Sequence, residues 1–283
     1  MEPYATVVIS YRDPGLLTGV LARLGAQNVP PALVVVVDNG GDLPADVVET
    51  SPLAQSTVLV RRPENPGYGA AVNVARALVV QRGIGRLLVL THDAVFGPDL
   101  GTGLGGALDD DGTGAVGPLL HWVSDPSRVF TAGGRLTRGG RAWNTVVPRS
   151  VTEPYPVDWL DGAIVMYSVA ALDRIGWLDE AYFLYFEDVD TSWRLRQAGF
   201  QVAVAPAVVA QQQPGAHPMR LGIRNMTLFA RKARLPLVPH LGAVSRRTAE
   251  EAVYRVLHRR SPDVLDAWRG WREGRRGITG RPV

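Results

Sequence analysis

Short apolar runs alternate with segments of helical periodicity over the first third of the chain. In the periodic segments, leucine and valine recur every three to four residues, and the first such segment follows an Asp-Pro pair that suits the start of a helix. The apolar runs predict strands at 5–10, 33–37, 56–60 and 86–90, and the periodic segments predict helices at 14–26 and 67–82. Strands that alternate with helices are typical of an α/β fold with a mostly parallel sheet covered on both faces.

The pattern changes after residue 127. Two Gly-Gly pairs within 128–147 predict a surface hairpin. The later elements are predicted as a turn leading into a strand at 157–168, helices at about 169–175 and 187–198, a strand at 200–206, and helices from 217 onward. No internal repeat or linker separates these elements. The pattern therefore predicts one α/β domain over 1–213 and a helical extension over 214–283.

Charge divides the chain at the same place. Residues 1–213 hold 15 Arg and 22 acidic residues, a net charge of −7. Residues 214–283 hold 14 Arg and Lys232 against five acidic residues, a net charge of +10. Such a basic segment is compatible with an anionic membrane surface, a phosphorylated substrate or nucleic acid, and equally with a solvated helical face.

The composition excludes several kinds of chemistry. The sequence contains no cysteine, so disulfides, thiolate metal sites and thiol catalysis are absent, and a bound metal is expected to be Mg²⁺ or Mn²⁺ held by oxygen or imidazole. No apolar run reaches the roughly 18 residues of a membrane-spanning helix, and residues 1–10 lack the pattern of a signal peptide. We therefore expect a cytoplasmic protein.

Acidic residues stand at the ends of two predicted strands. Asp38 follows 33–37 and precedes Asn-Gly-Gly, and Asp93 follows 86–90 in the sequence Thr-His-Asp. Because ligands bind beyond the carboxyl ends of parallel strands, both carboxylates are candidates for a nucleotide and metal site. A simple turn or cap is the alternative for each of them.

The glycine-containing segment ENPGYGAAVN, residues 64–73, lies between two of these strands. Its glycines let the backbone approach a ligand, and the helix that follows offers free N–H groups to a phosphate or a sugar. Ordinary helix initiation after a Pro-Gly turn is the alternative. The glycine spacing matches neither a dinucleotide fingerprint nor a P-loop.

The densest acidic cluster lies where the aromatic stretch FLYF, 183–186, meets a predicted helix. It consists of Glu187, Asp188 and Asp190. A carboxyl group that is partly buried near other acids has a raised pKa, which suits a general base. Acids in the first turn also stabilise a helix, but capping needs only one of the three.

The order of these motifs is specific. Along the chain they run VVISYR, VVVVDNGG, ENPGYGAAVN, LTHDA, FTAGG, VDWLDGA, GWLDEAYFLYFEDVDTSWRLRQAGF and RN at 224–225. In this order they resemble the family 2 glycosyltransferases of the GT-A fold, in particular their bacterial rhamnosyltransferase-like branch, over about residues 4–235. The resemblance implies a GT-A catalytic domain over 1–213, with a donor half at about 1–120 and an acceptor half at about 121–213.

The resemblance also implies roles for individual residues. Asp188 falls where the family carries its catalytic base, and Asp93 matches the last acid of the metal-binding D-x-D motif. Asp38 is expected at the nucleotide base or ribose. The segment beside the donor is matched by Asn65, Gly67 and Asn73. The turn that lines the donor sugar and the acceptor is matched by Asp161, Gly162 and Ala163. We therefore expect the carboxylates of Asp38, Asp93 and Asp188 to converge on one cleft.

Several positions depart from the family's pattern. Thr91 replaces the first acid of the D-x-D motif, so a metal has one carboxylate fewer and is expected to bind weakly or together with the donor; His92 is expected to be structural. Gln211 stands where relatives often place a metal-binding His, and His217, six residues later, is an alternative ligand. Arg12 stands where an Asn is usual after the first strand.

The resemblance implies an inverting glycosyltransferase that moves a sugar from a nucleotide-diphosphate donor to an acceptor hydroxyl. dTDP- or UDP-sugars are the expected donors, with dTDP-rhamnose first, and glycans, polyprenyl-linked glycans or natural products are the expected acceptors. The basic extension then suits peripheral contact with the inner membrane face. No nucleic-acid partner is expected, and a homodimer through helices at 240–273 stays open.

Two other functions compete with this hypothesis. A sugar nucleotidyltransferase is expected to carry a Gly-rich loop with Arg and Lys after the first strand, where this chain has only Arg12. A non-catalytic nucleotide-sugar-binding subunit of the same fold is favoured by Thr91 and Gln211, whereas the retained acids Asp93 and Asp188 oppose it.

Overall fold

The computed structural model describes residues 2–110, 112–215, 217–262 and 264–282. Its strands are β1 (Tyr4–Ser10), β2 (Leu33–Asp38), β3 (Thr57–Arg61), β4 (Arg86–Thr91), β5 (Val95–Phe96), β6 (Thr113–Trp122), β7 (Val129–Thr131), β8 (Gly134–Leu136), β9 (Ala142–Asn144), β10 (Tyr155–Pro156), β11 (Ile164–Ser168) and β12 (Gln201–Gln212). Its α-helices are α1 (Pro14–Gly25), α2 (Asp46–Glu49), α3 (Tyr68–Asn73), α4 (Ala75–Gln81), α5 (Leu100–Leu108), α6 (Val169–Ile175), α7 (Glu187–Gln197), α8 (Met219–Lys232), α9 (Leu237–Leu257) and α10 (Val264–Arg276). Two 3₁₀ turns lie at Ala54–Ser56 and Glu180–Tyr182.

The central sheet has a parallel half and a mixed half. Its strand order is β10-β12-β6-β11-β4-β1-β2-β3, with β5 paired to β12 and β7 to β6. Strands β4, β1, β2 and β3 are parallel, so their carboxyl ends share one edge. Strand β11 runs antiparallel between β4 and β6, and β12 runs parallel to β6. The direction of the strands therefore reverses beside β4, whose end carries Asp93.

Each face of the sheet is covered by its own helices, because β1 and β2 are mostly apolar and are buried on both sides along their whole length. One core cluster joins Val7 and Val35 to Val72 and Val79 of α3 and α4 and to Leu172 of α6. The other cluster, on the opposite face, joins β1 and β2 to α1 and α5. This layered sheet is the α/β architecture that the alternation of strands and helices predicts.

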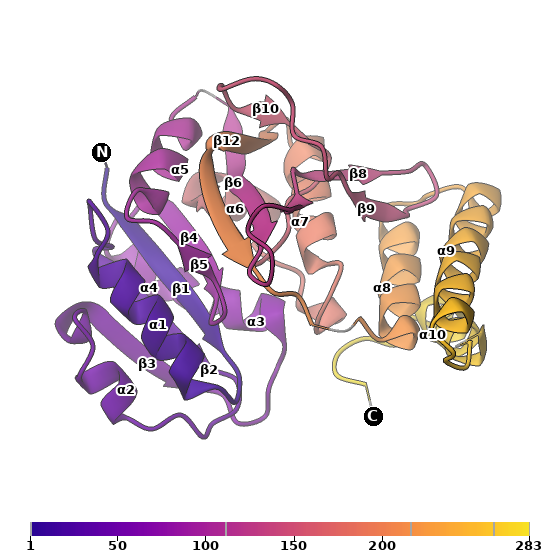
Figure 1. Ribbon diagram of the computed structural model, residues 1–283, viewed down its shortest axis with the longest axis horizontal. Coiled ribbons are helices and arrows are strands. Elements are labelled where there is room, and N and C mark those ends of the chain that lie inside the picture. Colours follow the sequence, from indigo (N-terminus) through magenta and orange to yellow (C-terminus); the bar gives the residue numbers. More distant parts are fainter. Residues whose placement is uncertain (1, 111, 216, 263, 283) are drawn as a thin grey trace.

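The helices α8, α9 and α10 lie to one side of the sheet, and the small β8–β9 hairpin lies between the sheet and these helices (Figure 1). A separate apolar cluster unites Met219, Ile223 and Met226 of α8 with Ala267 of α10. Three helices, α8, α9 and α10, therefore make up most of the described residues after 217, as predicted, while the boundary of a domain at 213 stays a prediction.

Three segments differ from the predicted elements. The helix predicted at 67–82 is split into α3 and α4 at Val74. The strand predicted at 200–206 extends to Gln212. Helix α5 and the long strand β6 lie in a segment for which no element was predicted; α5 in particular is rich in glycine and its periodicity is weak. The predicted hairpin within 128–147 is confirmed as β8–β9.

Candidate active site

Two cavities open on the chain near the reversal in strand direction. One, of about 880 Å³, lies at the carboxyl ends of β1 and β4 and is called the donor cavity below, after the ligand that the sequence analysis expects there. The other, of about 360 Å³, lies between the β8–β9 hairpin, α7 and the helices α8 and α9, and is called the acceptor cavity after the ligand expected beside Asp188. Ligand sites of α/β sheets are expected where the strand order or direction changes.

The donor cavity contains three of the residues that the sequence assigns to the nucleotide-sugar. Asn65, Gly67 and Asp93 all line it, and Thr91 and His92 lie beside Asp93. His92 Nδ1 lies 3.2 Å from the carbonyl oxygen of Ile9, which fits the structural role expected for this residue.

Asp38 holds the loop that follows β2. Its carboxylate accepts hydrogen bonds from the backbone N–H groups of Gly40, Gly41 and Leu43 at 2.8–3.0 Å and pairs with Arg61 at 3.2 Å. The side chain is only 1% exposed and lines neither cavity. The nucleotide contact assigned to Asp38 therefore stays a prediction, and the geometry gives this residue a positioning role.

Asn39 is the residue next to Asp38 that reaches the donor cavity, and the sequence analysis missed it. Its Nδ2 donates to the carbonyl oxygen of Gly67 at 3.3 Å, and its buried Oδ1 has no hydrogen-bond partner among the described residues. Because a buried unpaired acceptor is costly, Oδ1 is a candidate acceptor for a ligand N–H or hydroxyl. The Asp-Asn-Gly-Gly sequence was the signal, since the bend at Asp38 turns the next side chain inward.

Gly67 is required by the close approach of two loops. Its φ of +100° is unfavourable for other residues, and a Cβ atom there would lie 2.2 Å from the carbonyl oxygen of Phe183. The next residue, Tyr68, donates its backbone N–H to that same oxygen at 2.7 Å. The loop that contains Gly67 and the aromatic segment 183–186 before α7 are therefore held against each other.

Asn73 lies outside the donor cavity. Its side chain donates to the carbonyl oxygen of Leu178 at 2.9 Å and to Glu180 at 2.8 Å, and accepts from the backbone N–H of Leu178 at 3.2 Å. All of its polar atoms are thus engaged in holding the 178–180 segment on α3. A direct donor contact for Asn73 stays a prediction that this geometry does not support.

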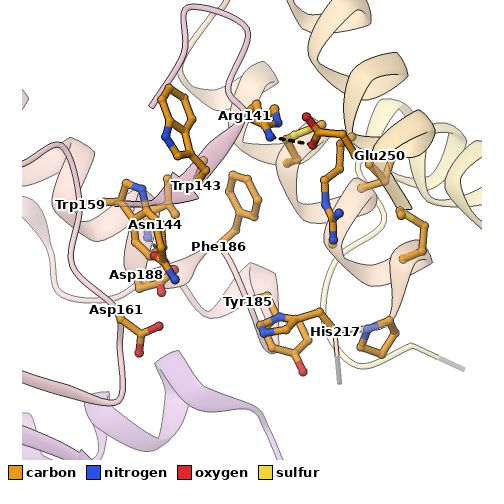
Figure 2. A pocket seen from close by; sticks show the side chains of 18 of the residues that line it. Arg141, Trp143, Asn144, Trp159, Asp161, Tyr185, Phe186, Asp188, His217 and Glu250 are labelled. Carbon is orange, nitrogen blue, oxygen red and sulfur yellow. Dashed lines mark hydrogen bonds and ion pairs between the residues drawn. The ribbon is translucent and has the colours of Figure 1, made fainter. Parts of the chain in front are cut away.

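Asp188 and Asp161 line the acceptor cavity together with aromatic side chains. Figure 2 shows the two carboxylates on one side of the cavity, with Asn144 near Asp188 and with Trp143 and Trp159 beyond them. Asp188 Oδ2 accepts a hydrogen bond from the backbone N–H of Gly162 at 3.4 Å, and Oδ1 accepts one from Val189 at 2.7 Å. The base expected from the sequence therefore faces a cavity large enough for a sugar ring.

The carboxyl groups of this region have raised pKa values. Burial raises the pKa of Asp188, and the charge of Asp161 adds to the effect. Burial also raises the pKa of Glu187, with the charge of Asp188 as the next cause. Burial raises the pKa of Asp161 to about 6, and the charge of Asp93 contributes to this shift. A carboxylate with a raised pKa is the stronger base, which suits proton removal from a hydroxyl.

Asp161 and Gly162 connect the two cavities. Asp161 lines the acceptor cavity, yet its pKa responds to Asp93 in the donor cavity. The hydroxyl of Tyr68, a donor-cavity residue, donates a hydrogen bond to the carbonyl oxygen of Gly162. The three carboxylates of Asp38, Asp93 and Asp188 therefore do not converge on one cleft as expected. Asp93 and Asp188 line two cavities that are linked through this turn, and Asp38 lines neither.

Strained backbone precedes Asp188. Phe183, Tyr185 and Phe186 all have φ between +68° and +73°, a conformation that bulky residues rarely adopt. The buried side chain of Asn225 on α8 holds this loop, because its Nδ2 donates to the carbonyl oxygens of Tyr182, Leu184 and Tyr185 at 2.8–2.9 Å. The RN motif at 224–225 therefore positions the loop that carries the base.

The candidate metal ligands do not gather around one point. Gln211 pairs with Val95 in the sheet, while its neighbours Gln212 and Gln213 line the donor cavity. His217 lies in the acceptor cavity, where its ring packs on that of Tyr185 with 4.3 Å between centroids. Among the described residues, no group of three or more His, Asp or Glu side chains is suited to hold a metal ion. Asp93 is the candidate ligand that lines the donor cavity, and its metal-binding role stays a prediction.

A GT-A-like sheet, a cavity at its parallel edge that contains Asp93, and the carboxyl group of Asp188 with its raised pKa in a second cavity are typical of a sugar-transferring enzyme. The family model described as "Glycosyltransferase like family 2" matches residues 2–231, and the chain belongs to this family. The chain is 31% identical over 229 residues to the N-acetylglucosaminyl-diphospho-decaprenol L-rhamnosyltransferase of Mycobacterium tuberculosis strain H37Rv. That alignment covers 71% of this chain and 73% of the relative. It is therefore a rhamnosyltransferase-like glycosyltransferase.

Solved structures confirm the GT-A fold. The mannosyltransferase PcManGT of Pyrobaculum calidifontis, in complex with GDP-Man and Mn²⁺, matches with a TM-score of 0.57 and 17% identity over 98% of this chain and 86% of its own. Residues 1–349 of S. aureus TarS match with a TM-score of 0.59 and 16% identity over 86% and 68%. GalNAc-T7 with UDP, GalNAc and Mn²⁺ matches with a TM-score of 0.63 and 14% identity over 82% of this chain, which spans 48% of that protein.

Proposed function

We propose that this glycosyltransferase transfers a sugar from a nucleotide-diphosphate donor, with dTDP-rhamnose first and UDP-sugars next, to an acceptor hydroxyl with inversion at the anomeric carbon. The observation that carries the proposal is the position of Asp188, a carboxyl group with a raised pKa that faces a cavity adjoining the one lined by Asp93. The similarity to a mycobacterial L-rhamnosyltransferase supports the choice of donor.

The chemistry needs one displacement. Asp188 takes the proton of the acceptor hydroxyl, and the oxygen attacks the anomeric carbon from the side of the acceptor cavity. The nucleoside diphosphate leaves toward the donor cavity with the bonding electron pair. A single displacement without a covalent intermediate inverts the configuration at the anomeric carbon.

A divalent cation, Mg²⁺ or Mn²⁺, would be held in the donor cavity by Asp93. It supplies neutralisation of the diphosphate's negative charge. The charge of Asp93 contributes to the raised pKa of Asp161, so a cation bound at Asp93 would also act on the Asp161 carboxylate. We expect Asp93→Ala to weaken donor binding and metal dependence together. An unchanged response to Mn²⁺ in calorimetric titrations with dTDP would contradict this assignment.

The acceptor we propose is a glycan linked through diphosphate to a polyprenyl lipid. The acceptor cavity is lined by apolar and aromatic side chains and by Arg247 and Glu250 of α9. Beyond Glu250, the end of α9 and the start of α10 carry exposed apolar side chains. This helix tip comprises residues 253–262 and 264–268, and its exposed apolar residues are Val253, Tyr254, Val256, Leu257, Val264, Leu265 and Trp268.

Basic residues surround the helix tip. Arg259 and Arg260 are exposed there and form no ion pair with a described residue. Apolar side chains flanked by Arg are complementary to the surface of an anionic membrane, where the lipid of the acceptor resides. No helix within the described part of the chain has the length and apolarity needed to cross a bilayer. We therefore propose peripheral contact through the helix tip.

Vesicle binding tests this contact. We expect the protein to sediment with vesicles that contain phosphatidylglycerol and to stay in the supernatant with phosphatidylcholine alone. Leu257→Ser and Leu265→Ser should each reduce sedimentation severalfold, whereas Val147→Ser, at an 80% exposed position far from the tip in sequence, should not. Equal binding by all variants, or a dimer that the tip substitutions dissociate, would show that lipid is not what covers this surface.

The transfer reaction is tested by a screen of nucleotide sugars with a polyprenyl-diphosphate glycan. We expect transfer from dTDP-rhamnose, with the anomeric configuration of the product opposite to that of the donor by NMR spectroscopy. Retention of configuration would exclude the single displacement. Binding of donors with neither transfer nor hydrolysis would instead favour the non-catalytic binding subunit.

A further inference from the structure

Beyond α10 the chain turns back from the helical extension to the α/β domain. The backbone N–H of Ile278 donates to the carbonyl oxygen of Glu273 at 3.0 Å, and Gly277 has a φ of +75°, so the helix ends in a left-handed turn. The backbone N–H of Gly280 then donates to the carbonyl oxygen of Ala181 at 2.8 Å. Figure 1 shows this yellow segment leaving the α8–α10 helices toward the sheet.

Arg281 brings a positive charge to the donor cavity. Its Nη1 lies 3.4 Å from the carbonyl oxygen of Glu64, in the loop that continues to Asn65 and Gly67. Arg281 and Pro282 both line the donor cavity with Asp93. The guanidinium is exposed and forms no ion pair with a described carboxylate, so its charge is available to a ligand.

No other cationic side chain lies among the described residues that line the donor cavity. Among its described lining residues, Asp93 is the only carboxylate and Arg281 the only Arg or Lys. A nucleoside diphosphate adds negative charge to this cavity. Thr91 and Gln211 provide no charge to a bound cation, and no group of three acidic or imidazole ligands is present among the described residues. A further source of positive charge is therefore needed, and Arg281 is the residue placed to supply it.

We propose that Arg281 binds the diphosphate of the nucleotide-sugar and stabilises it as it leaves. This proposal rests on the proposed function, since it assumes a diphosphate donor. In the transfer step, the acceptor oxygen forms a bond to the anomeric carbon, and its proton goes to Asp188. The bond from the anomeric carbon to the phosphate oxygen breaks, and its electron pair stays on the diphosphate.

Arginine is suited to this role because its planar guanidinium donates two parallel N–H groups to phosphate oxygens. The contact strengthens as negative charge develops on the leaving group, which is the condition for an effect on the chemical step and on binding alike. The turn at Gly280 and its bond to Ala181 position the side chain from outside the family-matched residues 2–231.

Calorimetric titrations of Arg281→Ala with dTDP, UDP, dTMP and thymidine test the proposal in the absence of added metal. We expect affinity for the two diphosphates to fall about tenfold, the effect of one lost charge-assisted bidentate contact. Affinity for dTMP should fall less, and that for thymidine should not change. Arg281→Lys should restore part of the loss, because it keeps the charge but not the bidentate geometry.

Arg276→Ala is the matched control, since it removes an exposed Arg five residues earlier that does not line the donor cavity. It should bind dTDP as the unchanged protein does. If Arg281→Ala binds dTDP as tightly as the unchanged protein and transfers sugar at the same rate, the role of Arg281 is wrong while the proposed function stands. If the unchanged protein binds no nucleoside diphosphate, both fail.

Discussion

The donor cavity and the acceptor cavity are built in different ways. The donor cavity lies at the ends of β1 and β4, and the residues that line it near Asp93 follow these strands directly in the sequence. The acceptor cavity is assembled from a hairpin, the start of α7 and two helices of the extension, which are up to about a hundred residues apart in the sequence. One site thus depends on strand ends and the other on tertiary packing.

Substitution of Asp188 should give the largest loss of transfer activity and best distinguishes the roles of the two cavities. Asp188→Asn keeps the shape of the side chain but removes the charge that accepts the proton. We expect transfer to fall by about 10²- to 10⁴-fold, the usual contribution of a general base. Because Asp188 lines only the acceptor cavity, the affinity for dTDP should stay within a few-fold.

Initial-rate measurements and calorimetry on the same preparation check this prediction. Asp190→Asn is a useful comparison, since Asp190 is buried with Tyr182 and Arg194 and lines neither cavity. It should reduce stability more than the rate per folded molecule. If Asp188→Asn loses dTDP binding as well, the base has been assigned to the wrong residue.

Gly67→Ala tests the contact between the donor loop and the segment that leads to Asp188. The new Cβ would lie 2.2 Å from the carbonyl oxygen of Phe183 in a backbone with φ of +100°. We expect a loss of about 1–3 kcal/mol in the free energy of unfolding, measured by urea denaturation, and a clear loss of dTDP affinity. Gly83→Ala, with φ of +62° but no atom within 4 Å, isolates the backbone strain and should cost less.

Rising pH should change the stability and the transfer rate in opposite directions. The raised pKa values of Asp188, Glu187 and Asp161, the last about 6, mean that folding disfavours their charged forms. Their stabilising contribution is therefore fully present below the unfolded pKa of about 4 and is lost as the pH rises through the folded values. The transfer rate should rise over the same range, because Asp188 must be ionised to accept a proton.

Glu187→Gln sharpens this test, since it removes a buried titratable carboxyl group that lies outside both cavities. The melting temperature should fall less with rising pH than in the unchanged protein. Glu49→Gln, at an exposed position of α2, should leave the profile as it was. A profile that is equally steep for both variants would mean that Glu187 is not a source of the pH dependence.

The donor cavity was easier to predict from the sequence than the acceptor cavity, because it is built from strand ends and the acceptor cavity from tertiary packing. The four parallel strands and the acids behind them were predicted, because apolar runs and turn residues are local signals. Asn39 and Tyr68 were missed, since their roles depend on contacts with Gly67 and Gly162 from other segments. Asp38 and Asn73 were placed at the ligand, whereas their side chains hold backbone segments, a difference that no local pattern reveals.

The aromatic walls of the acceptor cavity had no signal in the sequence. Trp143 and Trp159 come from the segments around the hairpin, where periodicity is absent, and Met219 and Ile223 come from α8. Their convergence depends on the docking of α8–α10, which Asn225 and the pair of Arg141 with Glu250 stabilise. Long-range packing of this kind determines which side chains line the acceptor cavity. The sequence patterns therefore said least about the identity of the acceptor.

Trp143→Ala should have the smallest effect on transfer, and it bears directly on the identity of the acceptor. Trp143 lies on β9, is 39% exposed and lines the acceptor cavity. Arg141 lies over its ring at 5.4 Å from Cζ to the centroid, and the exposed part of the ring can pack on a sugar face of the acceptor. We expect the KM for a polyprenyl-diphosphate glycan to rise by about three- to tenfold, the loss of roughly 1 kcal/mol of aromatic contact. The affinity for dTDP should not change, because no donor-cavity residue contacts β9 through the sheet. A rise in the KM for the donor instead of the acceptor would reverse the assignment of the two cavities.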